Sequence, residues 1–388
     1  MTPRPVTLFL VAGEPSGDRL GAALLRGLGE AGADVTASGV GGPAMAAEGL
    51  ASLFPYDELA VMGIAEVLPK YRALKRRIAQ TAQAFLDSGA EALVTIDSPD
   101  FCLRVAKIVK AARPETITIH YVAPSVWAWR PKRATKMARV VDHVLALLPF
   151  EPPYMEAAGM SCDFVGHPVV TEPVATAPDV TAFRDENGIG AAEKLVLVLP
   201  GSRRSEVTRL APIFGAALSG IDARLVLPTL PHLVAEVEAV TRGWSPRPII
   251  LAPEGDADPS FAAKKRAAFA AADVALAASG TVSLELAAAT TPMVIAYDMN
   301  WLTRFIVKRA IQVDTVTLVN LVSETRAVPE FLAEKCRPDA IRETLDRILA
   351  GDGADQLAAM KTTMDRLGRG GPPPGLRAAQ SVLRVLSR

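Results

Sequence analysis

The sequence has few cysteines, no excess of either charge and no long apolar run, and each scarcity excludes a class of protein. The three cysteines, Cys102, Cys162 and Cys336, lie far apart and form no CxxC or Cys/His metal motif, so neither a disulfide framework nor a zinc site is expected. Lysine plus arginine and aspartate plus glutamate each number 42, and a zero net charge argues against a general nucleic-acid binder. No apolar stretch reaches the roughly 18–20 residues of a membrane span.

What is present is typical of a globular chain with more than one domain. Half of the 388 residues are apolar and 22% are charged, which excludes a disordered chain, a coiled coil and a collagen-like fibre. At about 150 residues per domain, the length predicts two or three domains. Residues 6–13 form a short apolar run, but glycine and acidic residues follow at once, so we expect a strand and not a signal peptide. A soluble cytoplasmic protein, or one bound to a membrane surface, is therefore expected.

Short apolar, β-branched runs alternate with longer helical patterns along the chain. Nearly continuous apolar strands with intervening helices indicate parallel sheets buried on both faces. Two sets of about five strands predict an α/β fold with two doubly wound units, in preference to one sheet of ten or more strands. The predicted strands are 6–13, 34–42, 91–97, 116–124 and 140–149 in the first set, and 195–201, 223–228, 248–253, 273–280 and 293–298 in the second.

Proline-rich segments set the expected domain boundaries. Pro168, Pro173 and Pro178 fall in 164–179, and GRGGPPPG at 368–375 separates the body of the chain from a last helix. We expect a first domain at 1–167, a second at 168–367, and a C-terminal helix within 368–388.

The first predicted strand leads through AGEPSGD (12–18) into a helix. Gly13 and Gly17 permit a tight turn, and Ser16 or Asp18 is suited to cap the helix. Such a turn lies at the carboxyl edge of the sheet, where α/β folds bind ligands, although an ordinary capped turn explains it equally well. It is not a P-loop, because the GK[ST] ending is absent.

IDSPDF (96–101) places Asp97 at the same kind of edge. A carboxylate there is able to take a proton from an alcohol, while the alternative is a turn-forming aspartate. HYVAPSVWAWR (120–130) follows the next strand, and its Ser125 and Trp127 are typical of a pocket wall or, alternatively, of a core anchor. GVGGPA (39–44) lacks GxGxxG spacing, so a dinucleotide site is disfavoured.

LPGSRRSEV (199–207) is the most informative segment. After the strand, Ser202 and Arg203 open a helix, and amides at a helix N-terminus beside a fixed cation form an anion site. ASGTVSLELA (278–287) repeats this pattern, with Gly280 and Thr281 at the turn and Glu285 one turn into the helix. The two turns together indicate a nucleoside diphosphate, with Glu285 accepting ribose hydroxyls; each alone is an ordinary α/β turn.

One stretch points to a surface. In residues 63–80, apolar side chains recur at helical spacing and basic residues fill other positions, which is typical of a helix lying on an anionic membrane or of an ordinary surface helix. The predicted membrane-facing residues are Val67, Leu68, Tyr71, Arg72, Leu74 and Arg76. The first domain has further basic residues whose local clusters would favour acidic lipids: Arg104, Lys107, Lys110, Arg130, Lys132, Arg133, Lys136 and Arg139.

Metal-binding patterns are weak. GDAD (255–258) contains a DxD, but Asp258 is better interpreted as a helix cap, and no metal site is predicted. His167, in the segment FVGHP, either reaches a cleft or is structural.

These pieces together resemble the lipid-A-disaccharide synthases. The matching segments run in order from residue 12 to about 332: AGEPSGD, GVGGPAM, LAVMGIAEVLP, IDSPDF, HYVAPSVWAWR, LPFE, FVGHP, LPGSRRSEV, ASGTVSLELA and MVIAY to VPEFL. The family more often has VSPSVWAW and LPN where this chain has HYVAPSVWAW and LVN, which are mild departures.

The resemblance implies a GT-B glycosyltransferase, with two Rossmann-like domains facing across a cleft and the C-terminal helix crossing back to the first. The implied reaction joins UDP-2,3-diacylglucosamine to 2,3-diacylglucosamine 1-phosphate, giving a β-1,6-linked tetraacyl disaccharide 1-phosphate and UDP, without a cofactor. It implies that Asp97 is the base for the acceptor 6-hydroxyl and that Asn320 and Glu330 lie near the donor. Peripheral association with the cytoplasmic face of the inner membrane is implied, and a homodimer is left open.

Other interpretations compete with this one. Another GT-B enzyme, such as a MurG-like transferase or a UDP-GlcNAc epimerase, would share the two-domain pattern. A UDP-binding module without chemistry belongs to a different class, and it predicts no turnover to lose when Asp97 is changed. A dehydrogenase built on GVGGPA would require NAD binding.

Overall fold

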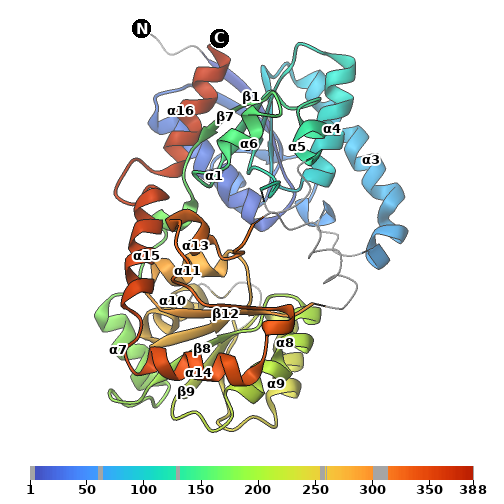
Figure 1. The fold of residues 1–388 in the computed structure, drawn as a ribbon. Coiled ribbons are helices and arrows are strands. Elements are labelled where there is room, and N and C mark those ends of the chain that lie inside the picture. The colour runs from blue at the N-terminus through green and yellow to red at the C-terminus, as the bar shows by residue number, and fades with distance from the viewer. Residues whose placement is uncertain are drawn as a thin grey trace. The chain divides into compact units, whose positions relative to one another are not determined.

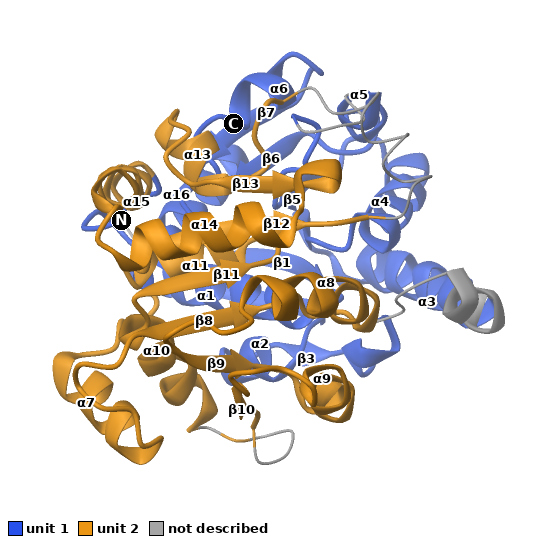
Figure 2. Cartoon of the chain, turned by 60° about the horizontal axis from the view of Figure 1, so that its bottom comes forward, with its two compact units in different colours: residues 1–171, 367–388 blue, residues 172–366 orange. Residues whose placement is uncertain are grey.

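A computed structural model describes residues 5–59, 64–127, 132–253, 258, 260–299 and 313–387, apart from the side chains of 64–71. The chain divides into two compact units (Figure 2). Unit 1 consists of Met1–Thr171 and Leu367–Arg388, and unit 2 of Glu172–Arg366. Unit 1 is therefore built from two separate stretches of sequence.

Unit 1 contains a parallel sheet whose strands follow the order β3-β2-β1-β4-β5-β6-β7 in the described residues. The central strands β1 and β4 are largely apolar and almost entirely buried, because helices cover both faces of the sheet (Figure 1). The strands are β1 Val6–Ala12, β2 Val35–Val40, β3 Ala51–Ser52, β4 Ala92–Ile96, β5 Ile117–Tyr121, β6 His143–Ala146 and β7 Ser161–Phe164. The helices are α1 Pro15–Glu30, α2 Pro43–Ala47, α3 Ile64–Ser88, α4 Pro99–Ala112, α5 Lys132–Met137, α6 Pro152–Glu156 and α16 Pro374–Leu386, with short 3₁₀ turns at Tyr56–Leu59 and Pro168–Thr171.

Unit 2 repeats the plan with the strand order β10-β9-β8-β11-β12-β13, again parallel. Its strands are β8 Leu195–Leu199, β9 Arg224–Pro228, β10 Ile249–Leu251, β11 Val274–Ala277, β12 Met293–Tyr297 and β13 Glu330–Leu332. Its helices are α7 Ala177–Glu186, α8 Arg204–Ala217, α9 Val234–Thr241, α10 Phe261–Ala271, α11 Val282–Ala288, α13 Leu318–Ser323, α14 Pro338–Leu349 and α15 Ala354–Arg366, with 3₁₀ turns at Pro231–Leu233 and Ala333–Lys335.

The prediction of two doubly wound α/β units is confirmed, and all ten predicted runs contain a strand. The expectation of about five strands in each unit was wrong, because it missed β3, β7 and β13. These three are edge strands, which pair on one side only and do not need the continuous apolar run of a central strand.

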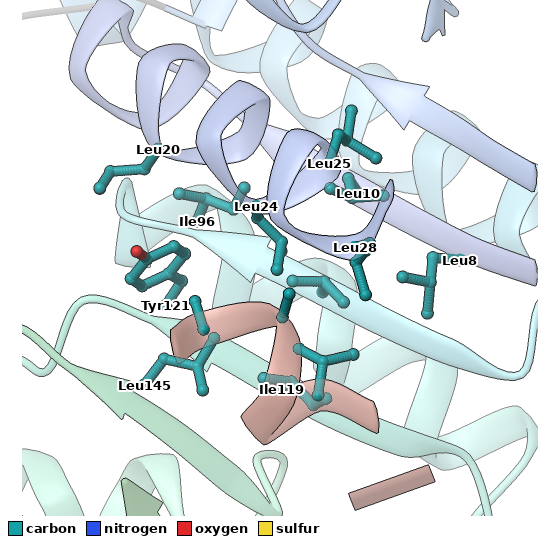
Figure 3. Packing of buried hydrophobic residues seen from close by; sticks show 14 of the residues in the cluster. Leu8, Leu10, Leu20, Leu24, Leu25, Leu28, Ile96, Ile119, Tyr121 and Leu145 are labelled. Carbon is teal, nitrogen blue, oxygen red and sulfur yellow. The ribbon is translucent and has the colours of Figure 1, made fainter. Parts of the chain in front are cut away.

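The core of unit 1 joins α1 and α16 to one face of the sheet. Figure 3 shows Leu20, Leu24 and Leu28 of α1 beside strand residues of the same buried cluster, among them Leu8 and Ile96. Helix α16 contributes two alanines and a valine to the same cluster, Ala378, Ala379 and Val382. The last helix thus completes the core of the first unit.

Two glycines allow α1 and the start of α16 to approach closely. A Cβ added at Gly27 would lie 2.6 Å from the carbonyl carbon of Gly375, and one added at Gly375 would collide with the backbone of Ala23. Polar contacts fix α16 from the other side, where Ser381 donates to Asp163 (2.6 Å) and Arg384 pairs with the same carboxylate (2.7 Å). Backbone contact of this kind leaves no room for a methyl group.

We expect Gly27→Ala to lower the free energy of unfolding by about 1–3 kcal/mol, because the neighbouring atoms are backbone and have little freedom to move aside. The matched control is Gly29→Ala in the same helix, where an added Cβ meets nothing within 4 Å. The control should be neutral or stabilising by up to about 1 kcal/mol. Urea unfolding followed by circular dichroism measures both, and equal stabilities for the two variants would contradict the packing described.

Candidate active site

In unit 1 the strand order reverses between β1 and β4, and doubly wound sheets bind ligands outside the carboxyl ends of the strands at such a point. Ala12 at the end of β1 pairs with Ile96 at the end of β4. The next residues along the chain, Gly13 and Asp97, therefore leave adjacent strands at this point. The sequence predicts that each residue follows the carboxyl end of a strand. The topology shows that these two strands are neighbours in one sheet.

Asp97 has an unusual backbone. Its φ is 52° and that of Ser98 is 40°, so two consecutive residues with side chains adopt the left-handed conformation. The Asp97 amide donates to the carbonyl of Tyr121 (2.9 Å), and the side chain is half-buried. Gly13 lies close by, since a Cβ there would lie 3.0 Å from Ser98 Oγ. Strain of this kind is retained where the surrounding structure holds a functional residue in place.

Glu14 also lies at this edge and was missed by the sequence prediction. Ser98 Oγ donates to Glu14 Oε1 (3.4 Å), which links the loops that follow β1 and β4. The available signal was an acidic residue at the N-cap of a helix directly after a predicted strand. Asp97 and Glu14 thus place two carboxyl groups near the reversal point.

Asp18, predicted to line the acceptor side, is instead a buried anchor. Its carboxylate accepts from the amides of Gly42 (2.8 Å), Ala44 (2.9 Å) and Met45 (3.0 Å), which fixes the start of α2. These amides are the ones that a dinucleotide phosphate at GVGGPA would require. Gly17 is buried, where a Cβ would lie 3.2 Å from the Ile96 carbonyl oxygen, and Ser16 is exposed in the first turn of α1.

In the segment after β5, Trp127 is a core anchor. Trp127 is 8% exposed, and its ring packs edge-on against Phe150 with centroids 5.2 Å apart. Ser125 is exposed, and residues 128–131 lie outside the described part of the chain.

Glu151 is a buried acid that the sequence prediction noted only within LPFE. It is 4% exposed, and Oε2 accepts from the amides of Leu147 (3.1 Å) and Leu148 (3.0 Å). Burial raises the pKa of Glu151 to about 7, and the two amides only partly oppose this rise. The folded protein therefore holds a proton on Glu151 at pH values where the unfolded chain has lost it.

In unit 2 the strand order reverses between β8 and β11, where Leu199 pairs with Ala277. A cavity of about 400 Å³ opens at this edge. It is lined by five predicted donor-site residues: Ser202, Arg203, Gly280, Thr281 and Glu285. The structure therefore brings together two glycine-containing loops that lie almost 80 residues apart in the sequence.

Glu206 occupies the amides that the sequence prediction treated as an open anion site. Its Oε2 accepts from the backbone N–H groups of Ser202 (3.1 Å) and Arg203 (3.3 Å), and its Oε1 lies 3.3 Å from the Arg203 guanidinium. Tyr297 also donates to this carboxylate at 3.5 Å. An internal carboxylate thus holds the start of α8 where an anion would bind.

Glu285 is paired with a cation that was not predicted. Lys265 Nζ, on α10, lies 2.6 Å from Glu285 Oε2 and 5.1 Å from the centre of the Phe269 ring. Phe261 from the same helix and Leu230 after β9 add an apolar side to the cavity. The cavity therefore combines two cations, the two carboxylates Glu206 and Glu285, and apolar side chains.

Asn320 and Glu330, predicted near the donor, do not line this cavity. Asn320 is 1% exposed and exchanges hydrogen bonds with the backbone of Val328 at 2.9 Å in both directions. Glu330 accepts from the amides of Val316 (2.9 Å) and Thr317 (2.6 Å). Glu330 thus holds the segment that leads into α13, and Asn320, within α13, holds the segment that follows it.

His167 and Asp258 have structural partners. His167 Nδ1 accepts from the amide of Val169 (3.2 Å), and burial lowers its pKa to about 4, so the ring is neutral at neutral pH. Asp258 Oδ1 accepts from the amides of Ser260 (2.9 Å) and Phe261 (3.2 Å) at the start of α10, as the cap interpretation predicts.

The predicted membrane face is only partly described, because the side chains of Val67, Leu68 and Tyr71 lie outside the described residues. Arg72 and Arg76 are exposed on α3. Leu74 is half-buried and packs against a core cluster of unit 1. Among the helices that the structure describes, none is both long enough and apolar enough to cross a bilayer.

Comparison with known proteins decides the family. The family model described as lipid-A-disaccharide synthetase matches residues 8–368. A lipid-A-disaccharide synthase of Ruegeria pomeroyi is 62% identical over 385 residues, which cover 98% of this chain and 95% of that protein. The chain belongs to the lipid-A-disaccharide synthase family. It is a glycosyltransferase that forms the lipid A disaccharide from a nucleotide-sugar donor.

Solved structures confirm the GT-B fold of this lipid-A-disaccharide synthase family member. MurG of Acinetobacter baumannii has a TM-score of 0.53 at 13% identity, covering 99% of both chains. A UDP-GlcNAc 2-epimerase of Neisseria meningitidis, bound to UDP-GlcNAc, has a TM-score of 0.61 at 10% identity, covering 99% of this chain and 100% of that one. Both rival enzyme types share the fold, and the family match assigns the reaction.

Glu151 gives a pH-dependent prediction. Because its pKa is raised in the folded state, its contribution to stability is complete below about pH 4.5 and is lost as the pH rises through about 7. From pH 5 to 8 we expect the wild type to lose on the order of 1–3 kcal/mol more unfolding free energy than Glu151→Gln, which keeps an acceptor oxygen. The control is Glu156→Gln, an exposed glutamate on α6, and denaturant unfolding at each pH measures the slopes. Identical slopes for wild type and Glu151→Gln would refute the assignment.

Proposed function

We propose that unit 1 binds 2,3-diacylglucosamine 1-phosphate as acceptor and that the cavity of unit 2 binds the UDP part of UDP-2,3-diacylglucosamine. The observation that carries this proposal is that the predicted base and the predicted donor residues leave their sheets at the two strand-order reversals. The acceptor 6-hydroxyl oxygen forms a bond to the anomeric carbon as the bond from that carbon to UDP breaks. The hydroxyl proton passes to Asp97, and the electron pair leaves with UDP.

Asp97 is suited to act as the base because its position is fixed while its carboxyl group stays accessible. Its strained backbone is held by the bond to Tyr121, and its side chain is half-buried. Glu14 lies on the adjoining loop and is suited to orient the acceptor through Ser98. Gly13 and Gly17 keep the backbone after β1 close to the end of β4, the exposed Ser16 lies in the first turn of α1, and the exposed Ser125 lies after β5.

In unit 2 the donor's diphosphate competes with Glu206. A diphosphate carries more charge than one carboxylate and takes over the Arg203 guanidinium and the amides of Ser202 and Arg203. The Gly280–Thr281 backbone forms the opposite side of the cavity. These fixed dipoles and the Arg203 cation stabilise the charge that gathers on UDP as the bond breaks.

The rest of the cavity fits a nucleoside. Glu285 accepts ribose hydroxyls while Lys265 remains beside it and contributes positive charge toward the phosphates. Leu230 and Phe261 pack against the uracil ring. Asn320 and Glu330 act indirectly, since their hydrogen bonds fix the segments on either side of α13.

The Asp97→Asn variant should lose most turnover, by about 100-fold or more, because the amide is unable to accept the hydroxyl proton. Its affinity for UDP should be unchanged, because the donor cavity lies in unit 2. The assay follows disaccharide and UDP from the two purified lipid substrates with EDTA present, and calorimetry measures UDP binding.

The matched control for Asp97 is Asp34→Asn, an exposed aspartate just before β2, at the amino edge of the same sheet. It should turn over normally. Normal turnover of Asp97→Asn would rule out its role as base, and UDP release without disaccharide in the wild type would point to hydrolysis.

Arg203→Ala and Arg204→Ala form a matched pair of adjacent arginines. Arg203 lines the cavity, whereas Arg204 pairs with Glu236 (3.5 Å) and is not among its lining residues. Arg203→Ala should weaken UDP binding about 10-fold and lower kcat as well, because the cation also stabilises the leaving group. Arg204→Ala should do neither. Equal effects of the two changes on the UDP dissociation constant would count against this donor site.

We propose further that α3 associates with the cytoplasmic face of the inner membrane through exposed cations that include Arg72 and Arg76. Both substrates are lipids, so an enzyme at the bilayer surface meets them without extracting four acyl chains into water. Arg77 contributes less, because Glu58 holds it at 2.7 Å and its guanidinium lies over Phe54.

Charge reversal tests the membrane proposal. The double change Arg72→Glu with Arg76→Glu should reduce binding to vesicles that contain anionic phospholipid, and should not affect binding to neutral vesicles. Arg242→Glu with Arg247→Glu changes the net charge equally at two exposed positions of unit 2. A vesicle sedimentation assay compares them, and equal losses would show a net-charge effect without a role for α3.

A further inference from the structure

A large basic hollow lies between α4 and α5 in unit 1. It has a volume of about 880 Å³, and Pro99 and Asp100 at the start of α4 form part of its wall. Its lining includes six cationic side chains: Arg104, Lys107, Lys132, Arg133, Lys136 and Arg139. Asp100 is the single carboxylate among its lining residues. We refer to this feature as the basic hollow.

Within the described residues, the basic hollow has six cations and a single carboxylate in its lining. Among the residues that the structure describes, none of the six cations has a carboxylate within 4.0 Å. Lys110, one turn further along α4, behaves differently, because it pairs with Asp142 at 2.8 Å. Like charges gathered in one recess repel one another and raise the local concentration of anions. A multiply charged anion would relieve this repulsion.

The hollow begins at the proposed catalytic edge. Pro99 and Asp100 follow Asp97 and Ser98 directly, and they belong both to the first turn of α4 and to the wall of the hollow. Arg104 lies one turn further along α4, and Lys107 nearly another turn beyond it. A ligand with one group at Asp97 therefore has cations within a short reach along α4.

We propose that the basic hollow binds the phosphate monoester of the acceptor lipid. This inference rests on the proposed function, in which the acceptor's 6-hydroxyl lies at Asp97. The phosphate is carried on the anomeric carbon of the same hexose, so one sugar ring separates the two groups. A phosphate monoester carries up to two negative charges, arginine is able to bind it with two hydrogen bonds, and lysine adds a point charge. The site would fix which hydroxyl of the acceptor faces Asp97.

A phospholipid of the bilayer offers similar chemistry but fits the position less well. A recess between two helices suits a compact, highly charged group, whereas a bilayer presents a broad surface to exposed side chains such as Arg72 and Arg76 of α3. Because the hollow begins beside Asp97, a ligand that takes part in the reaction fits its position better than a bilayer phospholipid does. The experiment must therefore distinguish binding of the acceptor phosphate from binding of the bilayer.

The test compares two acceptors that differ only in the phosphate: diacylglucosamine 1-phosphate and diacylglucosamine. The variants are Arg104→Gln with Lys107→Gln on α4, and Arg133→Gln with Lys136→Gln on α5. We expect each pair to raise KM for the phosphorylated acceptor at least 10-fold, while kcat, the donor KM and the KM for the acceptor without phosphate change less than 2-fold. The matched control, Lys110→Gln, should leave every constant unchanged, because Lys110 lies outside the hollow.

Three results would overturn the proposal. An unchanged KM for the phosphorylated acceptor would show that the hollow does not contact it. An equal rise in KM for both acceptors would show that the hollow contacts the acceptor but does not bind its phosphate. A loss of anionic-vesicle binding equal to that of Arg72→Glu with Arg76→Glu, without a change in acceptor preference, would assign the hollow to the bilayer.

A binding measurement separates this proposal from the proposed function. If the wild type transfers sugar to neither acceptor, the assignment of the reaction's substrates fails, and the hollow is tested by calorimetry with glucosamine 1-phosphate and glucosamine. Saturable binding of the phosphorylated sugar alone, lost in both variant pairs and kept in Lys110→Gln, would still support a phosphate site. Absence of such binding would overturn it.

Discussion

The reversal of strand order in each parallel sheet is the constraint on which the functional arrangement depends. The right-handed crossovers place β2 on one side of β1 and β4 on the other side. The loops after β1 and β4 therefore diverge and leave space at the carboxyl ends of the strands. The same geometry recurs at β8 and β11. Helices on both faces bury the strands and deny ligands any other access to the sheet. Chemistry is thereby confined to one edge in each unit.

Carboxylates at these edges serve different purposes, and their partners distinguish them. Asp18 is bound to the backbone amides of Gly42, Ala44 and Met45 and holds the start of α2 in place. Glu206 also holds amides, but it lies beside a cavity and an arginine, where we propose that the donor diphosphate replaces it. Asp97 has a half-buried carboxyl group on a strained backbone. Each of these carboxylates comes shortly after a strand in the sequence. Only their hydrogen-bond partners distinguish the carboxylates that hold the structure from the proposed base.

The sequence was sufficient for the central strands and for the two turns that line the cavity of unit 2. Continuous apolar runs reveal β1, β4, β8 and β11, because these strands are buried on both faces. Edge strands such as β13 lack this signal, and they depend on a partner that only the fold supplies. Lys265 was missed for a related reason: it lies in an alanine-rich helix, and nothing local indicates that Glu285 will be its partner. The internal hydrogen bonds of Asn320 and Glu330 also depend on the fold, because nothing local in the sequence indicates which backbone groups they contact.

The return of α16 to unit 1 has a consequence for synthesis on the ribosome. Every residue of unit 2 has been made before α16 is translated, although unit 1 begins first. Until then, α1 presents an uncovered apolar face and the glycine that receives the backbone of Gly375. The second unit is thus able to fold while the first is incomplete, and the first must remain soluble with part of its core open. The order of folding is then the reverse of the order in which the two units begin along the chain.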